Sequence, residues 1–195
     1  MAELPRAAGL IALQEGAKAP RRDALWRAIA ENHRANARLW DEEDLARRRR
    51  ASDRAIAANK RAIDRWNQKR NDAVERIDEA ILAALAPVGR RPDARRHSET
   101  AGAMIDRLSI LSLKVHHMRV QAGRTAAGRA HVERCKAKLA VLREQRADLA
   151  RSLDELLAAA ARGEAWFKIY RQFKMYNDPA LNPALYGEAR RARRS

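Results

Sequence analysis

The chain has 195 residues, of which 46% are hydrophobic and 34% are charged, and its formal net charge is +16. This length suffices for one domain with a buried core, and no extended Gly, Ser or Pro linker divides it. The single cysteine, Cys135, excludes an internal disulfide and a cysteine-based zinc site, and it fits a reducing compartment best. Abundant Ala, Arg, Glu and Leu with few Gly and Pro predict a helix-rich fold.

The excess of positive charge favours polyanionic partners, namely nucleic acid, an anionic membrane surface or phosphorylated small molecules. The arginines form their longest runs at residues 47–50 and 190–194, and the others are scattered among Asp and Glu. This scatter weakens the first two partners, so nucleic-acid binding through the arginine runs is kept as a lesser alternative. No apolar run approaches the roughly 18 residues of a membrane span, and Leu10 to Leu13 is too short for a signal peptide. We therefore expect a cytoplasmic protein without a membrane span.

Residues 1–20 contain two Pro and two Gly, which predicts a flexible N-terminal segment with at most a short helix near Leu10 to Gln14. Neither residue type occurs from Arg21 to Ala86. That interval can hold one helix of about 15 residues and a second of about 45. Because Asp41 is a suitable N-cap with acidic residues after it, we predict that the second helix runs from 41 to 86.

Residues 86–97 form the clearest loop, with two Pro, one Gly and four Arg. The helix that follows Thr100 is apolar nearly all round, which is typical of a central helix. Residues 129–161 then carry apolar side chains at the spacing of a heptad seam, and only Arg146 interrupts it. Gly163 is placed to cap the end of this seam helix.

The next segment is predicted to be a short helix with Trp166, Tyr170 and Phe173 in one stripe, acting as an aromatic plug or lid. Residues 188–195 are expected to be a basic disordered tail. Taken together, the elements predict an all-α fold, an elongated antiparallel helical bundle with long coiled-coil-like helices, in a single domain covering residues 1–195.

Four phrases of the sequence resemble the bacterial family called domain of unknown function 4254: NARLWDEEDLAR (36–47), DRWNQKRNDAVERID (64–78), SETAGAMIDRLSILSLKVHHM (98–118) and YRQFKMYNDPALNP (170–183). The resemblance spans roughly residues 21 to 187. One departure is Ala101, where the family often has a proline suited to the first helical position. The resemblance implies an association with glycosyltransferases of surface-glycan pathways, and hence phosphorylated or nucleotide-linked sugars as substrates.

A polar stripe runs along the predicted long helix at steps of three and four residues, beside an apolar seam. Buried or half-buried polar groups need partners, so the stripe indicates either a network between helices or a ligand site. Both alternatives remain open for its amides. The stripe comprises Asp64, Asn67, Asn71, Glu75 and Asp78, with Gln68 at its edge.

Acid and base candidates are Glu75, Asp106 and His117, the last two on one side of the central helix. Glu75 and Asp78 could hold Mg²⁺ together with Asp64 or Asp106. A helical nucleotide pyrophosphatase motif is incomplete, because Ala46 stands where its third upstream glutamate would be. Simple ion pairs with arginines such as Arg76 or Arg107 are the alternative, and no dedicated metal site is assigned.

The turn before the central helix is the best candidate for anion binding, because free N–H groups at a helix start attract phosphate. Thr100 would be the cap, and Arg107 and Lys114 add positive charge one and two turns later. An ordinary cap without a ligand is the alternative.

The leading hypothesis is a helical protein that binds an anionic sugar-phosphate or nucleotide-sugar ligand in a polar interhelical pocket, within surface-glycan biosynthesis. Asn67, Gln68, Asn71, Thr100, Arg107 and Lys114 would bind the ligand. Whether it is an enzyme stays open. The alternatives are a non-catalytic scaffold or partner of a glycosyltransferase, including a homo-oligomer, and the nucleic-acid binder mentioned above.

Overall fold

The computed structural model describes residues 3–192, which form six α-helices joined by short irregular segments. An all-α helical bundle is therefore confirmed. Two short strands, β1 (Arg95–Arg96) and β2 (Ala165–Trp166), pair in parallel, and two 3₁₀ turns are η1 (Thr125–Ala127) and η2 (Met175–Asn177). The helices are α1 (Ala7–Gln14), α2 (Ala24–Ala46), α3 (Asp53–Leu85), α4 (Ala101–Ala122), α5 (Arg129–Ala161) and α6 (Pro183–Ala192).

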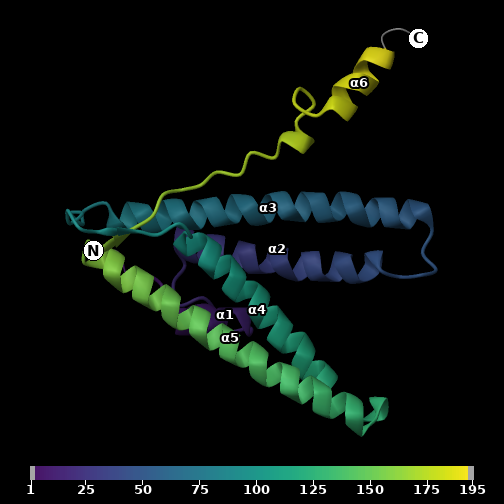
Figure 1. The fold of residues 1–195 in the computed structure, drawn as a ribbon, viewed down its shortest axis with the longest axis horizontal. Coiled ribbons are helices and arrows are strands. Elements are labelled where there is room, and N and C mark those ends of the chain that lie inside the picture. Colours follow the sequence, from purple (N-terminus) through teal and green to yellow (C-terminus); the bar gives the residue numbers. More distant parts are fainter. Residues whose placement is uncertain (1–2, 193–195) are drawn as a thin grey trace.

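The long helices form two antiparallel pairs, α2 with α3 and α4 with α5 (Figure 1). The pairs meet where α4 begins and diverge from there, so the body has the outline of a V in this view (Figure 1). Helix α4 packs against α1, α2, α3 and α5. It is thus the central helix that its apolar surface predicted.

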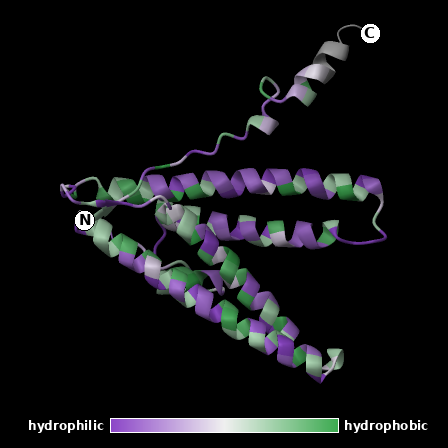
Figure 2. Cartoon of the chain, in the orientation of Figure 1, coloured by the Kyte–Doolittle hydropathy of each residue, from purple (hydrophilic) through white to green (hydrophobic). Residues whose placement is uncertain are grey.

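The core lies where the two pairs meet. Leu10, Ile29, Ile77, Ile105 and Leu153 are completely buried there and come from α1 to α5. Figure 2 shows apolar residues concentrated on α4 and on the end of α3 next to the start of α4, whereas the rest of α3 is mostly polar. The N-terminal segment, expected to be flexible, contains α1, which covers this core.

The predicted helix from 41 to 86 is wrong. Helix α2 continues through Asp41 to Ala46, the arginine run at 47–50 forms the turn, and α3 begins at Asp53. The Ser52 side chain caps α3 by accepting a 3.3 Å hydrogen bond from the Ala55 backbone N–H. A serine cap followed by an aspartate is a start signal that acts without Gly or Pro. The interval therefore holds two helices, as predicted, but the turn between them lies after Ala46 and not before Asp41.

The predicted aromatic helix is also wrong. Gly163 ends α5 with a φ of 71°, as a C-terminal glycine cap, and the chain then runs extended beside residues 95–97. A Cβ at Gly163 would lie 2.2 Å from the Gly89 carbonyl oxygen, so this approach requires glycine. His97 N–H donates to the Trp166 carbonyl at 2.8 Å. Residues 95–97 thus supply the hydrogen bonds that the segment at Trp166 would have made internally in a helix.

The aromatic residues of this segment are divided between core and surface. Phe167 is buried, whereas Phe173 is 86% exposed. Of the predicted basic tail, residues 188–192 belong to α6 and residues 193–195 lie outside the described part of the chain. Among the described residues, no helix has the length and apolar character needed to cross a lipid bilayer.

Candidate functional site

The polar stripe of α3 meets the start of α4 through one close contact. The Asp78 Oδ1 atom accepts a 2.6 Å hydrogen bond from the Gly102 backbone N–H. A Cβ at position 102 would lie 2.7 Å from the Val74 carbonyl oxygen and 2.8 Å from the Asp78 Cγ atom, so only glycine allows the two helices to approach this closely. The stripe and the α4 start, which the sequence predicted to be two walls of one site, therefore pack together.

A cavity of about 440 Å³ opens beside this contact, between α3, α4 and the segment that follows β2. We call it the α3–α4 cavity. Five of the predicted site residues line it together, namely Asn71 and Glu75 from α3 and Thr100, Asp106 and Arg107 from α4. Asp78, a candidate Mg²⁺ ligand in the sequence analysis, lines it as well. The sequence did not single out its other polar residues as site residues: Arg70, Ser98, Glu99, Tyr170 and Gln172.

Asp106 is held from behind by two asparagines of α2. Its Oδ1 accepts hydrogen bonds from Asn32 Nδ2 at 2.7 Å and from Asn36 Nδ2 at 2.9 Å. Ser109 Oγ, one turn along α4, contacts Asn36 Nδ2 at 3.1 Å and His33 Nδ1 at 2.9 Å. Burial lowers the pKa of His33. These partners fix the Asp106 carboxylate at the cavity wall.

Sequence reasoning missed this asparagine pair, although a signal was present. Asn32 and Asn36 are four residues apart, on the helical face that also carries Ile29 and Trp40. Both amides are buried. Two amides on the apolar face of an amphipathic helix predict a polar partner on a neighbouring helix.

Arg70 presents an unused donor beside this network. Its Nε atom is buried and has no hydrogen-bond partner among residues 3–192, and it lies 4.0 Å from Asp106 Oδ2. The Arg70 side chain is 30% exposed and lines the cavity. Because its Nε atom makes only this long ion-pair contact and the side chain is partly exposed, the guanidinium group of Arg70 is available to an oxygen of a bound ligand.

The start of α4 already holds an anion from its own chain. Thr100 Oγ1 accepts from the Ala103 backbone N–H at 3.1 Å, as the predicted cap, and the Asp78 carboxylate occupies the Gly102 N–H. Burial raises the pKa of Asp78 to about 6, although hydrogen bonds from Thr100 and Gly102 lower it. An external anion would have to replace Asp78 at this helix start. Asp78 can also exchange a proton near neutral pH.

Glu75 fastens the segment after β2 over the cavity. Its Oε2 atom pairs with Arg171 Nη1 at 2.6 Å, and its Oε1 atom accepts from the Gln172 backbone N–H at 3.2 Å. Arg171 also pairs with Glu79 at 2.7 Å, and Asn71 Nδ2 donates to Gln172 Oε1 at 3.2 Å. The arginine partner of Glu75 is thus Arg171, from a distant part of the sequence.

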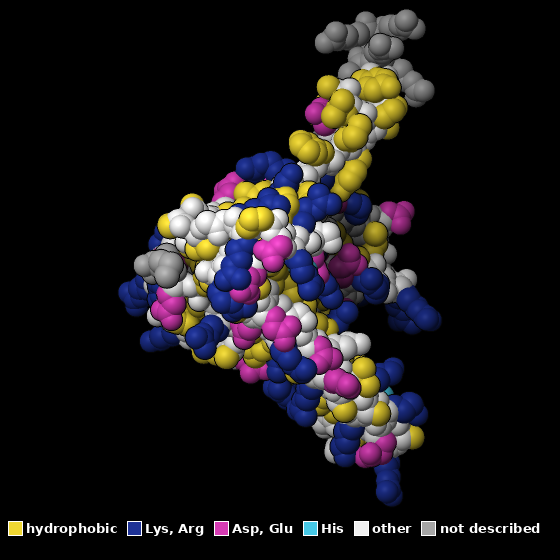
Figure 3. Space-filling model, turned by 60° about the vertical axis from the view of Figure 1, so that its left-hand side comes forward, with side chains coloured by type: hydrophobic (Ala, Val, Ile, Leu, Met, Phe, Trp, Pro, Cys, Tyr) yellow, Lys and Arg dark blue, Asp and Glu magenta, His cyan; other side chains and the backbone are white. Residues whose placement is uncertain are grey.

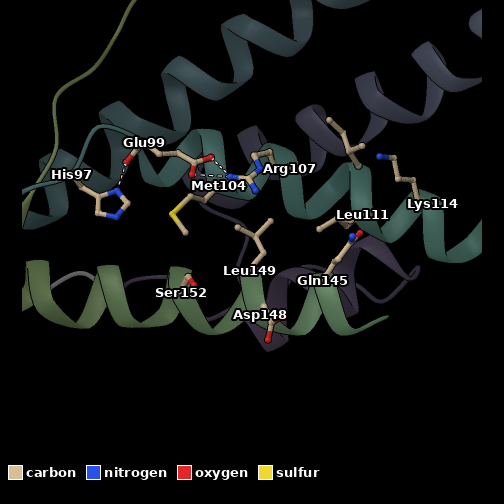
Figure 4. A pocket seen from close by; sticks show the side chains of 11 residues that line it. His97, Glu99, Met104, Arg107, Leu111, Lys114, Gln145, Asp148, Leu149 and Ser152 are labelled. Carbon is tan, nitrogen blue, oxygen red and sulfur yellow. Dashed lines mark hydrogen bonds and ion pairs between the residues drawn. The ribbon is translucent and has the colours of Figure 1, made fainter. Parts of the chain in front are cut away.

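A second, larger cavity of about 830 Å³ lies on the other side of α4, against α5. We call it the α4–α5 cavity. Figure 4 shows Arg107 next to Glu99, and Lys114 further along the same helix, with Gln145, Asp148 and Ser152 on the opposing wall. Arg107 Nη1 lies 2.7 Å and 2.8 Å from the two carboxylate oxygens of Glu99. Arg107 and Glu99 line both cavities.

A family model described as "Protein of unknown function (DUF4254)" matches residues 26–169 of the chain. The chain belongs to this family. No curated protein and no solved structure matches it. The matched range contains nearly all of α2 and the whole of α3 to α5, and therefore the helical walls of both cavities, whereas Tyr170, Gln172 and α6 lie beyond it.

Four predicted site residues of this DUF4254 chain lie away from the α3–α4 cavity. Lys114 lines the α4–α5 cavity instead. His117 stacks on Trp40, with ring centroids 4.2 Å apart, and partial burial lowers its pKa, as does the neighbouring His116. Asn67 lines a separate cavity of about 370 Å³ beside Trp40. Gln68 is exposed and donates to Asp72 on its own helix at 2.7 Å. The structure therefore does not bring His117 together with Glu75 and Asp106.

Metal binding has little geometric support in the part of the DUF4254 chain that the structure describes. No group of three or more His, Cys, Asp or Glu side chains there is arranged to hold a metal ion. The carboxylates of Asp78 and Asp106 accept hydrogen bonds from N–H donors, and that of Glu75 is paired with Arg171. Mg²⁺ therefore remains a hypothesis from the sequence.

Proposed function

We propose that the α3–α4 cavity binds an anionic, sugar-linked phosphate ligand of the sugar-phosphate or nucleotide-sugar class. The observation that carries the proposal is the guanidinium group of Arg70, in a cavity that Arg107 also lines. Its Nε atom makes no hydrogen bond in the described chain and only a 4.0 Å ion pair with Asp106 Oδ2. Guanidinium groups match the geometry of phosphate oxygens and are the usual ligands for them.

The other lining groups suit the sugar portion of such a ligand. The carboxylates of Glu75 and Asp106 and the amide of Asn71 can accept or donate hydrogen bonds to hydroxyl groups. The ring of Tyr170, which lines the cavity and is 53% exposed, offers an apolar surface. A volume of about 440 Å³ is within the usual range for small-molecule sites.

Arg107 would change partner when the ligand binds. Its side chain is 57% exposed, and exposed ion pairs such as that with Glu99 contribute about 1 kcal/mol or less. A phosphate carries more charge than a carboxylate and can replace Glu99 at little cost. Arg107 would then close on the ligand from α4 while Arg70 holds it from α3.

A role in surface-glycan biosynthesis is the context that the family resemblance supplies for this ligand. Chemistry on a bound ligand would fall to Asp78, whose pKa of about 6 suits proton transfer, and to Glu75 or Asp106. The binding proposal does not depend on that chemistry.

Isothermal titration against a panel of sugar phosphates and nucleotide sugars tests the proposal. We expect one class to bind, and Arg70→Ala and Arg107→Ala each to weaken binding by about tenfold or more, the loss of one charge-assisted contact. Arg61→Ala is the matched control, since Arg61 is an exposed arginine on α3 away from the cavity. Absence of binding across the panel would refute the proposal.

A further inference from the structure

We propose that the C-terminal arm, residues 173–192, binds the surface of an anionic lipid bilayer. The arm includes η2 and α6, and it leaves α3 and runs away from both helix pairs (Figure 1). This interaction is independent of ligand binding in the α3–α4 cavity, because no residue of the arm lines that cavity.

The arm exposes large apolar side chains in an unusually dense series. Phe173 is 86% exposed, Met175 58%, Tyr176 63% and Leu181 50%. Figure 3 shows hydrophobic side chains gathered over the arm, whereas on the body they are interspersed with charged ones. Contiguous exposed apolar surface of this kind marks a site of interaction.

The positive charge of the protein favours an anionic bilayer as the partner of the arm. Residues 173–192 contain three Lys and Arg residues and two Asp and Glu residues, and the chain as a whole carries a net charge of +16. Exposed aromatic and aliphatic side chains on a strongly basic protein are typical of segments that lie in the interface of anionic membranes. Tyr and Phe insert at headgroup depth while Lys and Arg remain at the charged surface.

A second copy of the chain is a poorer occupant of the arm. Each copy carries a net charge of +16, so two copies repel each other, and a basic arm adds to that repulsion. An anionic bilayer instead attracts both the arm and the body.

The residues just before the arm bind to α3, and they fix where the arm leaves the body. Arg171 pairs with Glu75 and Glu79, both on α3, and Gln172 accepts from Asn71. A bilayer held by the arm would therefore lie on the α3 side of the molecule.

Vesicle co-sedimentation of the full chain tests the proposal. We expect binding to vesicles of phosphatidylglycerol mixed with phosphatidylcholine and at least about tenfold weaker binding to phosphatidylcholine alone. Part of the binding should persist at about 1 M NaCl, where the screening length falls to about 3 Å and only apolar insertion remains effective. The triple variant Phe173→Ser, Met175→Ser, Tyr176→Ser keeps every charge and should weaken binding by at least about tenfold.

The matched control is Leu45→Ser, Val120→Ser, Val141→Ser, which removes three exposed apolar side chains from the body, 41%, 52% and 52% exposed. It should bind as the unmodified protein does. The proposal fails if the unmodified chain does not sediment with the anionic vesicles, or if both triple variants bind equally. It also fails if lipid-free sedimentation velocity shows a dimer that the arm variant abolishes, because a second copy would then cover the arm.

Discussion

Asp78 Oδ1, in the middle of the bundle, accepts a 2.6 Å hydrogen bond from the backbone N–H of Gly102 in the first turn of α4. The contact joins the polar stripe of α3 to the start of the central helix. It also replaces solvent at a helix N-terminus with a carboxylate, which the helix dipole favours. The α3–α4 cavity owes its two walls to this contact.

Gly102→Ala should destabilise the protein by about 1–3 kcal/mol, because the added methyl group overlaps the Val74 carbonyl oxygen and the Asp78 carboxylate. Urea unfolding followed by circular dichroism measures the change. Gly187→Ala in α6 is the control, since a Cβ there meets nothing within 4 Å. Equal midpoints for the two variants would contradict the close approach of α3 and α4.

The free energy of unfolding of Asp78→Asn, compared with that of the unmodified protein, should increase as the pH rises. The folded state raises the pKa of Asp78 from 3.8 to about 6, so it favours the protonated carboxyl. The stability due to this group is therefore complete below about pH 4 and is lost as the pH rises through 6. Asparagine does not ionise, and the stability of the variant relative to the unmodified protein should increase over that window by up to about 3 kcal/mol.

Chemical denaturation at intervals from pH 4 to pH 7.5 provides this comparison. Asp72→Asn, an exposed carboxylate on the same helix, serves as the control and should give a curve parallel to that of the unmodified protein. A constant difference between Asp78→Asn and the unmodified protein would mean that Asp78 is not held in its protonated form.

The hydrogen bond between Asn32 and Asp106 should show strong coupling in a double-mutant cycle with Ala at each position. Asn32 is fully buried and donates at 2.7 Å to a carboxylate that is 16% exposed, so the coupling energy should be about 1–3 kcal/mol. The cycle for Glu99 and Arg107 is the comparison, and its exposed pair should couple by less than about 1 kcal/mol. Similar values for the two cycles would argue against a buried polar network.

Arg171→Ala should release the base of the arm with little effect on global stability. Arg171 is 54% exposed, so loss of its two ion pairs should cost about 1 kcal/mol or less. The Gln172 amide, which donates to Glu75, should exchange with deuterium faster. Arg151→Ala removes an exposed pair within α5 and should leave that amide unchanged.

Apolar spacing and capping residues in the sequence predicted α5 and the start of α4. The seam helix 129–161 corresponds to α5, and the Thr100 cap begins α4, because apolar spacing and capping residues determine both. The break after Ala46 was missed because Ser52 gave a weaker signal than the acidic residues after Asp41. The segment at Trp166 was missed because its hydrogen bonds go to β1, a pairing distant in sequence.

Part of the candidate site could likewise be predicted from local signals, and part could not. Periodicity placed Asn71 and Glu75 on one face of a helix, and the cap placed Arg107 on the next, so both walls of the cavity could be predicted. The role of Arg70 could not be predicted. Its Nε makes no hydrogen bond in the described chain, and Asp106, the carboxylate beside it, is held by Asn32 and Asn36 from a third helix. The spacing of Asn32 and Asn36 indicates only that they have a polar partner on another helix. Which residue that partner is depends on the tertiary packing.

Arg107 lines cavities on both sides of α4, and one guanidinium group cannot extend fully into both. A ligand that draws Arg107 into the α3–α4 cavity removes it from Lys114 and the wall of α5. The two cavities therefore compete for the same positive charge, and filling one should weaken the affinity of the other for anions.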